Sequence, residues 1–477
     1  MSAPEDIRTI HARWVATAEP GMPSVLEDQV ISFGEDGRIA AIVPRDDFSG
    51  KIDMHLPTHI VIPGLVNCHT HTPMTLLRGY ADDLPLQEWL FQHVFPTEGK
   101  FIMQAKQEEA KEFIRCGSEL AVYEMLKTGT TLFNDMYFHG DVTADVVQKA
   151  GCKAVLAPMG LLYFGDDMFA ATLKTNIDWC TELAKTGVER VYPSLIPHSA
   201  YMVPEAKLQE AYQAYKDACS MSGMPFVIHT HMHESEKELA DLLEKDWNTA
   251  KKSAVQVFDG LGMLSGGRTV CAHCVHMSEE EILLMAARGA SIAHNPRSNL
   301  KLGSGISPIS KMLKAGVNVC LGTDGAASNN TLDMLSEMQY ASLLAKGSSR
   351  DPTVLPAVDA LRMATLWGAK ALGLDSETGS LKPGKAADLI AVDLAHLEAA
   401  PIFDPLSTLV FTNRREVTHV WVNGRCLVHE GRVLTLKPDL ERIEVLVGKI
   451  REFRKTLPGR DAAVGSIPMM LCRACGI

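Results

Sequence analysis

The sequence predicts an α/β fold, in which a TIM-like (β/α)8 barrel carries a small β-sandwich domain made from both ends of the chain. The first observation is that eight apolar runs of strand length alternate with longer stretches of helical pattern, which is typical of parallel β/α units. The second is that both flanks are rich in short β-like pieces. The apolar runs lie at residues 60–66, 130–134, 153–158, 191–196, 225–228, 269–272, 290–293 and 317–321.

A doubly wound open sheet is the structural alternative to the barrel. Such a sheet usually has a glycine-rich phosphate-binding turn after its first strand. At that position this chain has His69-Thr70-His71 instead. Helical patterns between the runs are clear at residues 108–127 and 279–287, so the alternation of strands and helices favours the closed barrel.

Hairpin signals occur on both sides of the barrel region. Residues 35–38 form a turn between two β-like pieces, and Asn423-Gly424 is a two-residue hairpin turn. Because such pieces occur at both ends, we expect them to pair into one small domain. The predicted domains are residues 1–60 with 375–440, a barrel of residues 61–374, and a C-terminal helix and tail of residues 441–477.

Composition argues against several classes of protein. The 477 residues carry a net charge of −12, which disfavours a nucleic-acid or anionic membrane partner. We expect no signal peptide, and no stretch of 18 apolar residues predicts a membrane span. The 11 cysteines are spread through apolar runs, which indicates buried thiols in the cytoplasm. Cys472 and Cys475 form one CxxC pair, which alone is weak evidence for a metal or redox site.

Polar residues with metal-binding capacity gather at the ends of the predicted strands. In parallel barrels, the chemistry takes place at the C-terminal ends of the strands. Random placement would not choose one end of nearly every strand, so the set indicates a functional site. Its members are His69, His71, Asn134, Asp135, His198, His231, His273, His294 and Asp324.

The first predicted strand supplies a pair of histidines. In a strand, residues i and i+2 point the same way, so His69 and His71 can bind one ion together. Zinc prefers nitrogen and oxygen ligands, and catalytic zinc keeps an open position for water. Asp324 adds a carboxylate at the eighth strand, which neighbours the first strand once the barrel closes.

The stretch VIHTHMHES, residues 227–235, supplies the third histidine. We interpret His231 as the ligand and Glu234 as the group that moves protons. His229 lies deeper and is interpreted as a core or supporting group. His233 is interpreted as a packing or supporting residue, with a substrate contact as the alternative.

A site with two metal ions is the obvious rival. It would usually need a bridging carboxylate or a modified lysine at a middle strand end. The third and fourth strand ends offer Pro158 and His198 instead, so the sequence favours one divalent ion.

Several longer motifs carry a family resemblance. They are PGLVNCHTHTPMTLLRG (63–79), LQEWLF (86–91), PHSAY (197–201), HMHESEKE (231–238), AHCVH (272–276), HNPRSNLKLGSGISP (294–308) and LGTDGAASNN (321–330). Across roughly residues 25–435 the chain resembles the amidohydrolase superfamily and, more narrowly, the methylthioadenosine/S-adenosylhomocysteine deaminases. The His-x-His pair is shared by the whole superfamily, whereas TLLRG, EWLF and SNLKLGSG are more specific to this branch.

The resemblance implies a hydrolase that deaminates a 5'-modified adenosine to the inosine analogue and ammonia. It implies one divalent ion held by His69, His71, His231 and Asp324. Zinc is favoured, with iron or manganese as alternatives. The implied partner is therefore a small nucleoside, and a homo-oligomer remains an open alternative to a single chain.

The resemblance also implies roles for the neighbouring side chains. Glu234 would act as acid and base, Asp324 would take the proton from water, and His273 would orient the attacking water. Glu88 would accept hydrogen bonds from the ribose hydroxyls, and His198 would contact the substrate. Without the resemblance, Glu88 is interpreted as a carboxylate that favours a helix N-terminus.

One position departs from the family pattern. Members that accept S-adenosylhomocysteine have an arginine after the third strand, which meets the amino-acid carboxylate, and this chain has Met159. A site that cannot pair a buried carboxylate discriminates strongly against it, whereas methionine suits an apolar tail. 5'-Methylthioadenosine is therefore favoured over S-adenosylhomocysteine or adenosine. The open alternatives are an amidohydrolase acting on a triazine or another aminopurine, and a non-catalytic scaffold.

Overall fold

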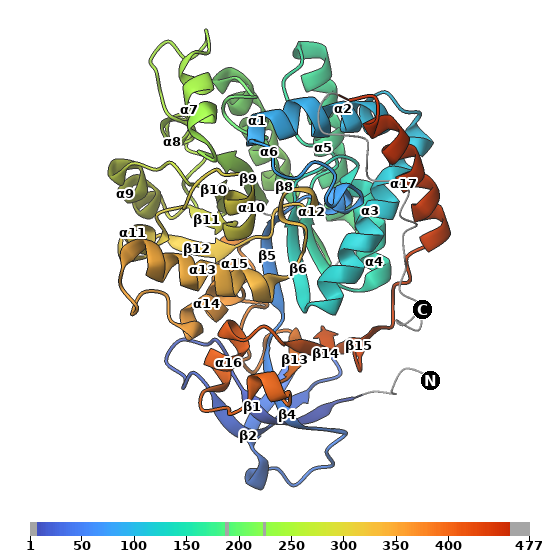
Figure 1. The fold of residues 1–477 in the computed structure, drawn as a ribbon, viewed down its shortest axis with the longest axis vertical. Coiled ribbons are helices and arrows are strands. Elements are labelled where there is room, and N and C mark those ends of the chain that lie inside the picture. Colours follow the sequence, from blue (N-terminus) through green and yellow to red (C-terminus); the bar gives the residue numbers. More distant parts are fainter. Residues whose placement is uncertain (1–6, 187–189, 223–225, 458–477) are drawn as a thin grey trace.

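Two eight-stranded sheets organise the computed structural model (Figure 1), which describes residues 7–457 except 187–189 and 223–225. One is a parallel barrel whose strands follow chain order, as predicted. Its strands are β5 (Leu65–Thr70), β6 (Thr130–Asp135), β7 (Lys153–Leu156), β8 (Val191–Leu195), β9 (Val227–Met232), β10 (Thr269–His273), β11 (Ser291–His294) and β12 (Asn318–Leu321). Within the described residues no helix is both long and apolar enough to cross a membrane.

Helices connect the barrel strands, and the long ones cover the outside of the barrel (Figure 1). They are α3 (Gln107–Lys127), α4 (Gly140–Ala150), α5 (Asp166–Thr186), α6 (Glu205–Ser222), α7 (Glu236–Leu243), α8 (Ala254–Gly260), α9 (Glu279–Arg288), α10 (Pro296–Lys301), α11 (Ile309–Lys314), α12 (Ala326–Asn329), α13 (Met334–Ser349), α14 (Ala357–Met363) and α15 (Leu366–Ala371). The helices predicted at residues 108–127 and 279–287 are confirmed as α3 and α9.

Side chains join the first and last strands of the barrel. The amide of Asn67 donates to Thr323 Oγ1 at 2.7 Å, and its oxygen accepts the Thr323 N–H at 3.0 Å. The Asp324 N–H donates to the His69 carbonyl at 2.9 Å. A Cβ on Gly322 would lie 2.8 Å from the His69 Cβ, so only glycine allows this approach. The closure therefore brings Asp324 next to the histidines of β5.

The second sheet is formed from both ends of the chain, as predicted, and its strands make one continuous mixed sheet. Both predicted hairpins are confirmed, because β2 pairs with β3 and β14 pairs with β15, each antiparallel. The strand order is β16-β15-β14-β13-β4-β1-β2-β3. The strands are β1 (Thr9–Val15), β2 (Leu26–Phe33), β3 (Ile39–Pro44), β4 (Met54–Pro63), β13 (Leu389–Asp393), β14 (Glu416–Val422), β15 (Arg425–His429) and β16 (Arg432–Val433).

One predicted strand is wrong. Residues 60–66 were expected to form the first barrel strand, but the run divides at Gly64 between β4 and β5. The Gly64 N–H donates to the Asp388 carbonyl at 3.0 Å, and a Cβ at Gly64 would lie 2.1 Å from Thr131 Oγ1. Glycine thus lets the chain leave one sheet and enter the other. A continuous apolar run cannot show this division, because both strands are buried.

A buried ion pair joins the barrel to the second sheet. Lys153 Nζ lies 2.6 Å from Asp388 Oδ2, and their side chains are 1% and 0% exposed. Asp388 also accepts hydrogen bonds from Thr378 Oγ1 at 2.7 Å and from the Asn423 N–H at 2.8 Å. A buried pair persists only when its remaining polar atoms are satisfied, and here the two sheets supply them together. The second sheet therefore sits at a defined place below the N-terminal ends of the barrel strands (Figure 1).

Short helices within residues 86–103 form a roof over the opposite end of the barrel (Figure 1). Two of them, Trp89–Val94 and Gly99–Met103, are π-helical. The C-terminal helix α17 (Leu440–Arg454) packs beside this roof and α3 (Figure 1), and Phe453 meets Phe101 edge to face at 5.7 Å. The predicted helix at the C-terminal end is thus confirmed, while Cys472 and Cys475 lie outside the described residues. The remaining helices are η1 (Arg45–Asp47), η2 (Thr72–Leu77), α1 (Leu86–Glu88), η3 (Trp89–Val94), α2 (Phe95–Glu98), η4 (Gly99–Met103), η5 (Leu397–Ala399) and α16 (Pro405–Phe411).

Candidate active site

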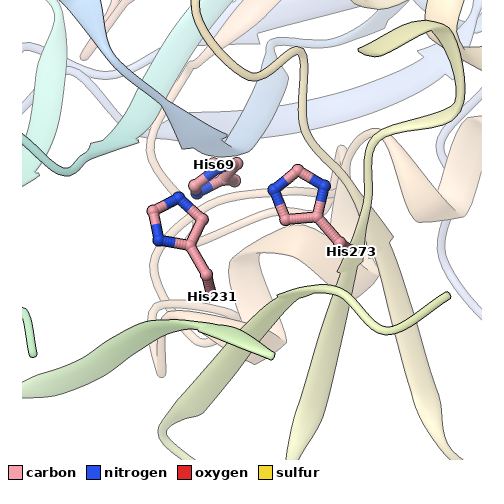
Figure 2. A group of neighbouring side chains, drawn as sticks. All are labelled: His69, His231 and His273. Carbon is pink, nitrogen blue, oxygen red and sulfur yellow. The ribbon is translucent and has the colours of Figure 1, made fainter. Parts of the chain in front are cut away.

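The C-terminal ends of three barrel strands bring histidines together. His69 lies on β5, His231 on β9 and His273 at the end of β10, and all three are buried. Figure 2 shows their imidazoles turned toward one another, and nitrogen atoms from all three lie within 4.8 Å of each other. His71 follows β5 and Asp324 follows β12, so the predicted set converges at one point.

Distances within the cluster suit a metal ion. His71 Nε2 lies 3.1 Å from Asp324 Oδ1 and 3.4 Å from His231 Nε2, and His69 Nε2 lies 3.4 Å from Asp324 Oδ1. Ligands about 2.1 Å from a tetrahedral ion are about 3.4 Å apart. Among the described residues, His69 Nε2 is buried and has no hydrogen-bond partner. A cation would satisfy this nitrogen, so the residues fit a bound metal ion.

Asp324 keeps a negative charge within the cluster. Burial lowers the pKa of His69 to about 3, so its ring is neutral and offers a lone pair. Burial alone would raise the pKa of Asp324, but the His69 and His71 rings hold it well below its usual value. Burial would likewise lower the pKa of His71, but Asp324 raises it to about 9. The buried carboxylate therefore stays negative and pairs with a cation, which is either a protonated His71, 3.1 Å away, or a bound metal ion.

The far side of each histidine ring is held by a second group. Such partners fix the tautomer and the orientation of a metal-binding imidazole. The pairs are His69 Nδ1 with His229 Nε2 at 2.7 Å, His71 Nδ1 with the Met136 carbonyl at 2.6 Å, His231 Nδ1 with the His198 carbonyl at 3.0 Å, and His273 Nδ1 with Asn299 Oδ1 at 2.8 Å. His229 thus contacts the ring of His69 on the side away from the cluster, where a supporting group would lie.

His229→Phe is expected to weaken metal binding about 10–100-fold, the usual cost of losing a group that orients a ligand. Phenylalanine keeps the ring volume but cannot hold His69 Nδ1. The measurement is competition for the metal against a chelator of known affinity.

The matched control is His233→Phe. His233 Nε2 accepts the Ala254 N–H at 3.2 Å at the start of α8, away from the cluster. This change should lower the melting temperature and leave metal affinity unchanged. Equal losses of affinity in the two variants would contradict the role of His229.

Left-handed backbone marks the strand ends that carry the site. His233, His273 and Asp324 have φ of 51°, 73° and 62°, a region that residues with a Cβ rarely adopt. Such conformations cluster at functional sites, where the surrounding structure enforces them. Here they turn the chain so that the side chains after β9, β10 and β12 face one another.

Glu234 lies beside the cluster. Its Oε2 is 3.8 Å from His273 Nε2, and its side chain is 11% exposed. Burial raises the pKa of Glu234, so this carboxyl retains a proton to higher pH than an exposed one. A buried acid next to the cluster can donate that proton to a bound molecule.

A cavity opens from the cluster toward the roof. Its walls are mainly apolar and aromatic, and among the described residues no lysine or arginine lines it. The lining residues are His71, Met74, Leu86, Trp89, Leu90, Phe95, Glu98, Met136, Tyr137, Phe138, Gly160, Leu162, Ile196, His198, Tyr201, His231, Glu234, His273, Leu302 and Asp324. His198 is thus placed where the sequence predicted a contact with substrate.

Two residues chosen from the sequence do not line this cavity. Glu88 is half-buried, and its neighbours Leu86 and Trp89 face the cavity instead. The main chain of Met159 is held by the Asn176 side chain, with hydrogen bonds of 3.0 and 2.9 Å. At that place the cavity is lined by the next residues along the chain, and the Met159 side chain packs in the apolar cluster under the roof.

Glu98 lines the cavity and was missed in the sequence. It is 4% exposed, and its Oε1 has no hydrogen-bond partner among the described residues. Burial raises the pKa of Glu98 to about 7. The available signal was a second carboxylate ten residues after Glu88. The π-helical segment between them, Trp89–Val94, alters the usual 3.6-residue period, so sequence spacing could not show which carboxylate faces inward.

Comparison with known proteins gives a consistent family. A family model described as amidohydrolase family matches residues 60–427. A protein of Teredinibacter turnerae named 5-methylthioadenosine/S-adenosylhomocysteine deaminase is 39% identical, with 90% of this chain and 93% of that protein aligned. A 5'-deoxyadenosine deaminase of Methanothermobacter thermautotrophicus is also 39% identical, with 87% and 94% aligned.

Solved structures of similar fold contain zinc. The structure of an adenosine deaminase from Xanthomonas campestris with bound zinc is 35% identical, with a TM-score of 0.81 and coverage of 94% of this chain and 98% of that one. An atrazine chlorohydrolase from Arthrobacter aurescens complexed with zinc is 24% identical, with a TM-score of 0.80 and coverage of 93% and 99%, and shares the fold. Together with the donor set, the zinc-bound adenosine deaminase structure indicates a site for a divalent metal ion.

Proposed function

Since the chain belongs to the amidohydrolase family, we propose that it is a metal-dependent hydrolase that removes the 6-amino group of a 5'-modified adenosine. The observation that carries the proposal is a buried His69–His71–His231–Asp324 cluster with Glu234 beside it, at the base of one cavity. Relatives named as deaminases of 5'-modified adenosines support the choice of substrate class.

Zinc is the ion that we propose for the cluster. Three imidazole nitrogens and one carboxylate oxygen suit zinc, and a solved relative holds zinc. Iron and manganese remain alternatives, because metal availability often decides the occupancy of such sites. When bound, a divalent ion lowers the pKa of water from about 15.7 towards 7 and so provides the nucleophile at neutral pH.

The side chains then move the protons of the reaction. Asp324 accepts a proton from the attacking water, and Glu234 donates its proton to ring nitrogen N1 as the oxygen adds to C6. Because His273 Nδ1 donates to Asn299 Oδ1 at 2.8 Å, its Nε2 is free to orient the water by accepting a hydrogen bond. Asp324 then gives its proton to the amino group while Glu234 takes the proton of the new C6 hydroxyl, so the C6 carbonyl forms, ammonia leaves and both carboxyl groups return to their starting state. The sum is adenosine analogue plus water to inosine analogue plus ammonia.

We propose that Glu98 accepts the hydrogen bonds from the ribose hydroxyls that the sequence analysis expected of Glu88, because Glu98 lines the cavity and Glu88 does not. We expect Glu98→Gln to raise KM for nucleosides about 10–100-fold, since a hydrogen bond to a charged group contributes roughly 1.5–3 kcal/mol. Metal content should not change. The measurement is ammonia release as a function of nucleoside concentration.

Glu88→Gln is the matched control for Glu98→Gln. Glu88 lies on the same segment of the roof but does not line the cavity. The KM of the Glu88→Gln enzyme for nucleosides should therefore remain that of the wild type. The assignment of Glu98 would be wrong if Glu88→Gln raised KM and Glu98→Gln did not.

The cavity also favours a neutral 5' substituent. The acidic residues in its walls are Glu98, Glu234 and Asp324, and among the described residues it has no lysine or arginine in its walls. An amino-acid carboxylate would therefore lie unpaired among acids and apolar groups, which opposes binding. We propose 5'-methylthioadenosine as the preferred substrate over S-adenosylhomocysteine.

A panel of compounds screened for ammonia release tests the proposed function. It includes 5'-methylthioadenosine, 5'-deoxyadenosine, adenosine, S-adenosylhomocysteine and an aminotriazine, and a chlorotriazine is followed by chloride release. We expect the highest kcat/KM with 5'-methylthioadenosine. Faster turnover of S-adenosylhomocysteine would refute the preference for a neutral tail. Turnover of a triazine with none of any nucleoside would refute the proposed substrate class.

A further inference from the structure

Glu238 is a buried carboxylate that the proposed reaction does not use. It lies in the first turn of α7 and is 4% exposed, whereas Glu236 in the same turn is exposed. Burial, together with the charge of Glu234, raises the pKa of Glu238 to about 7. Within the described part of the chain, it forms no salt bridge with lysine or arginine. A buried carboxylate needs partners for both of its oxygens. Since no lysine or arginine of the described residues supplies them, the groups that donate hydrogen bonds to Glu238 indicate what this side chain does.

Both oxygens of Glu238 accept main-chain N–H groups of the turn that carries Glu234. The Glu234 N–H donates to Oε2 at 2.7 Å, and the His233 N–H donates to Oε1 at 3.3 Å. Consecutive N–H groups in such a turn form a concave site for an anion. The Glu238 carboxylate occupies this site from within the chain.

The turn needs this support because its backbone is unfavourable. β9 ends at Met232 and α7 begins at Glu236, so three residues connect strand and helix. His233 adopts φ 51°, which crowds a residue that has a Cβ. On the other side, the His233 carbonyl accepts the N–H groups of Val275 and His276 at 3.0 and 3.1 Å. The turn is therefore held on one side by the Glu238 carboxylate and on the other side by the main chain of Val275 and His276.

We propose that Glu238 is a positioning residue, whose carboxylate binds the N–H groups of His233 and Glu234 and fixes the turn from which the Glu234 side chain reaches the substrate. This inference rests on the proposed function, in which Glu234 donates the proton. Glu238 touches neither substrate nor metal in this role, so it acts through Glu234 alone.

Glu238→Gln is expected to lower kcat about 100-fold, as for a catalytic group misplaced by about 1 Å. The glutamine oxygen can accept one N–H, but its NH2 group faces the other. KM for 5'-methylthioadenosine and the bound metal should change little, because the cavity walls and the ligand cluster are retained. The control is Glu236→Gln, which should keep the kcat of the wild type.

A double-mutant cycle with Glu234→Gln separates positioning from a general loss of structure. Residues that act as one unit show non-additive effects. If Glu238 acts through Glu234, the double variant should have the kcat of Glu234→Gln alone. Losses that multiply, or a folded Glu238→Gln with the kcat of the wild type, would overturn the proposal.

Melting temperature is measured for each variant. If Glu238→Gln does not fold, Glu238→Asp carries the test, since it keeps the charge but is one methylene too short to reach both N–H groups. A folded Glu238→Asp with lowered kcat supports the proposal, and one with the kcat of the wild type overturns it. If Glu234→Gln itself keeps the kcat of the wild type, the proposed function falls, and the role of Glu238 with it.

Discussion

Glu234→Gln is expected to lower kcat for 5'-methylthioadenosine about 10²–10⁴-fold, the usual contribution of a positioned acid. Glutamine has the same size and can still form a hydrogen bond with N1, but it cannot transfer a proton. Because Glu234 lies 3.8 Å from His273 and is not one of the four proposed ligands, metal content should remain that of the wild type.

Two measurements check the Glu234→Gln prediction together. Ammonia release gives kcat and KM, and elemental analysis gives the metal per chain. The control is Glu236→Gln, whose side chain is exposed two residues away. Retention of activity within about tenfold would place the acid elsewhere, because even weak acid catalysis contributes more than this.

Asp324→Asn is expected to abolish tight metal binding and to lower kcat by about 10³-fold or more, since metal assistance contributes several kcal/mol and 1.36 kcal/mol corresponds to tenfold. The amide keeps the shape of the side chain but loses the negative charge that lies 3.1 Å from His71 and 3.4 Å from His69. It also loses the base that accepts the proton of water.

Asp135→Asn is the matched control for Asp324→Asn. Asp135 is also a buried aspartate at a strand end, but its oxygens accept hydrogen bonds from the Thr72 N–H at 2.7 Å and Thr72 Oγ1 at 3.0 Å. This variant should keep its metal after dialysis against a chelator, whereas Asp324→Asn should lose it. The wild type should lose activity with the chelator and regain it with zinc. Full metal retention by Asp324→Asn would show that the ion is held elsewhere.

Much of the barrel and most of the proposed ligands could be predicted because they depend on local rules. Strand-length apolar runs predicted the β/α alternation, and the i, i+2 rule placed His69 and His71 on one face. His231 and Asp324 followed from the tendency of parallel barrels to carry chemistry at strand ends. The structure brings all four side chains together.

Other residues could not be found from the sequence because their environment is created by distant segments. The π-helical turns of the roof decide that Glu98, and not Glu88, faces the cavity. Gly64 divides one apolar run between two sheets because of its contact with Asp388. No rule of sequence spacing predicts which of Glu88 and Glu98 lines the cavity, or that Gly64 contacts Asp388.

The sequence by itself determined the alternation of strands and helices, the terminal pairing of β segments and the chemical type of the site, since each follows from the period and order of residues along the chain. Only the tertiary structure decided which groups support that site. His229 stands behind His69, 160 positions away in the chain, and Asn299 stands behind His273, 26 positions away. Such partnerships arise where separate strands and loops meet at the C-terminal end of the barrel, and there burial gives each hydrogen bond a single geometry.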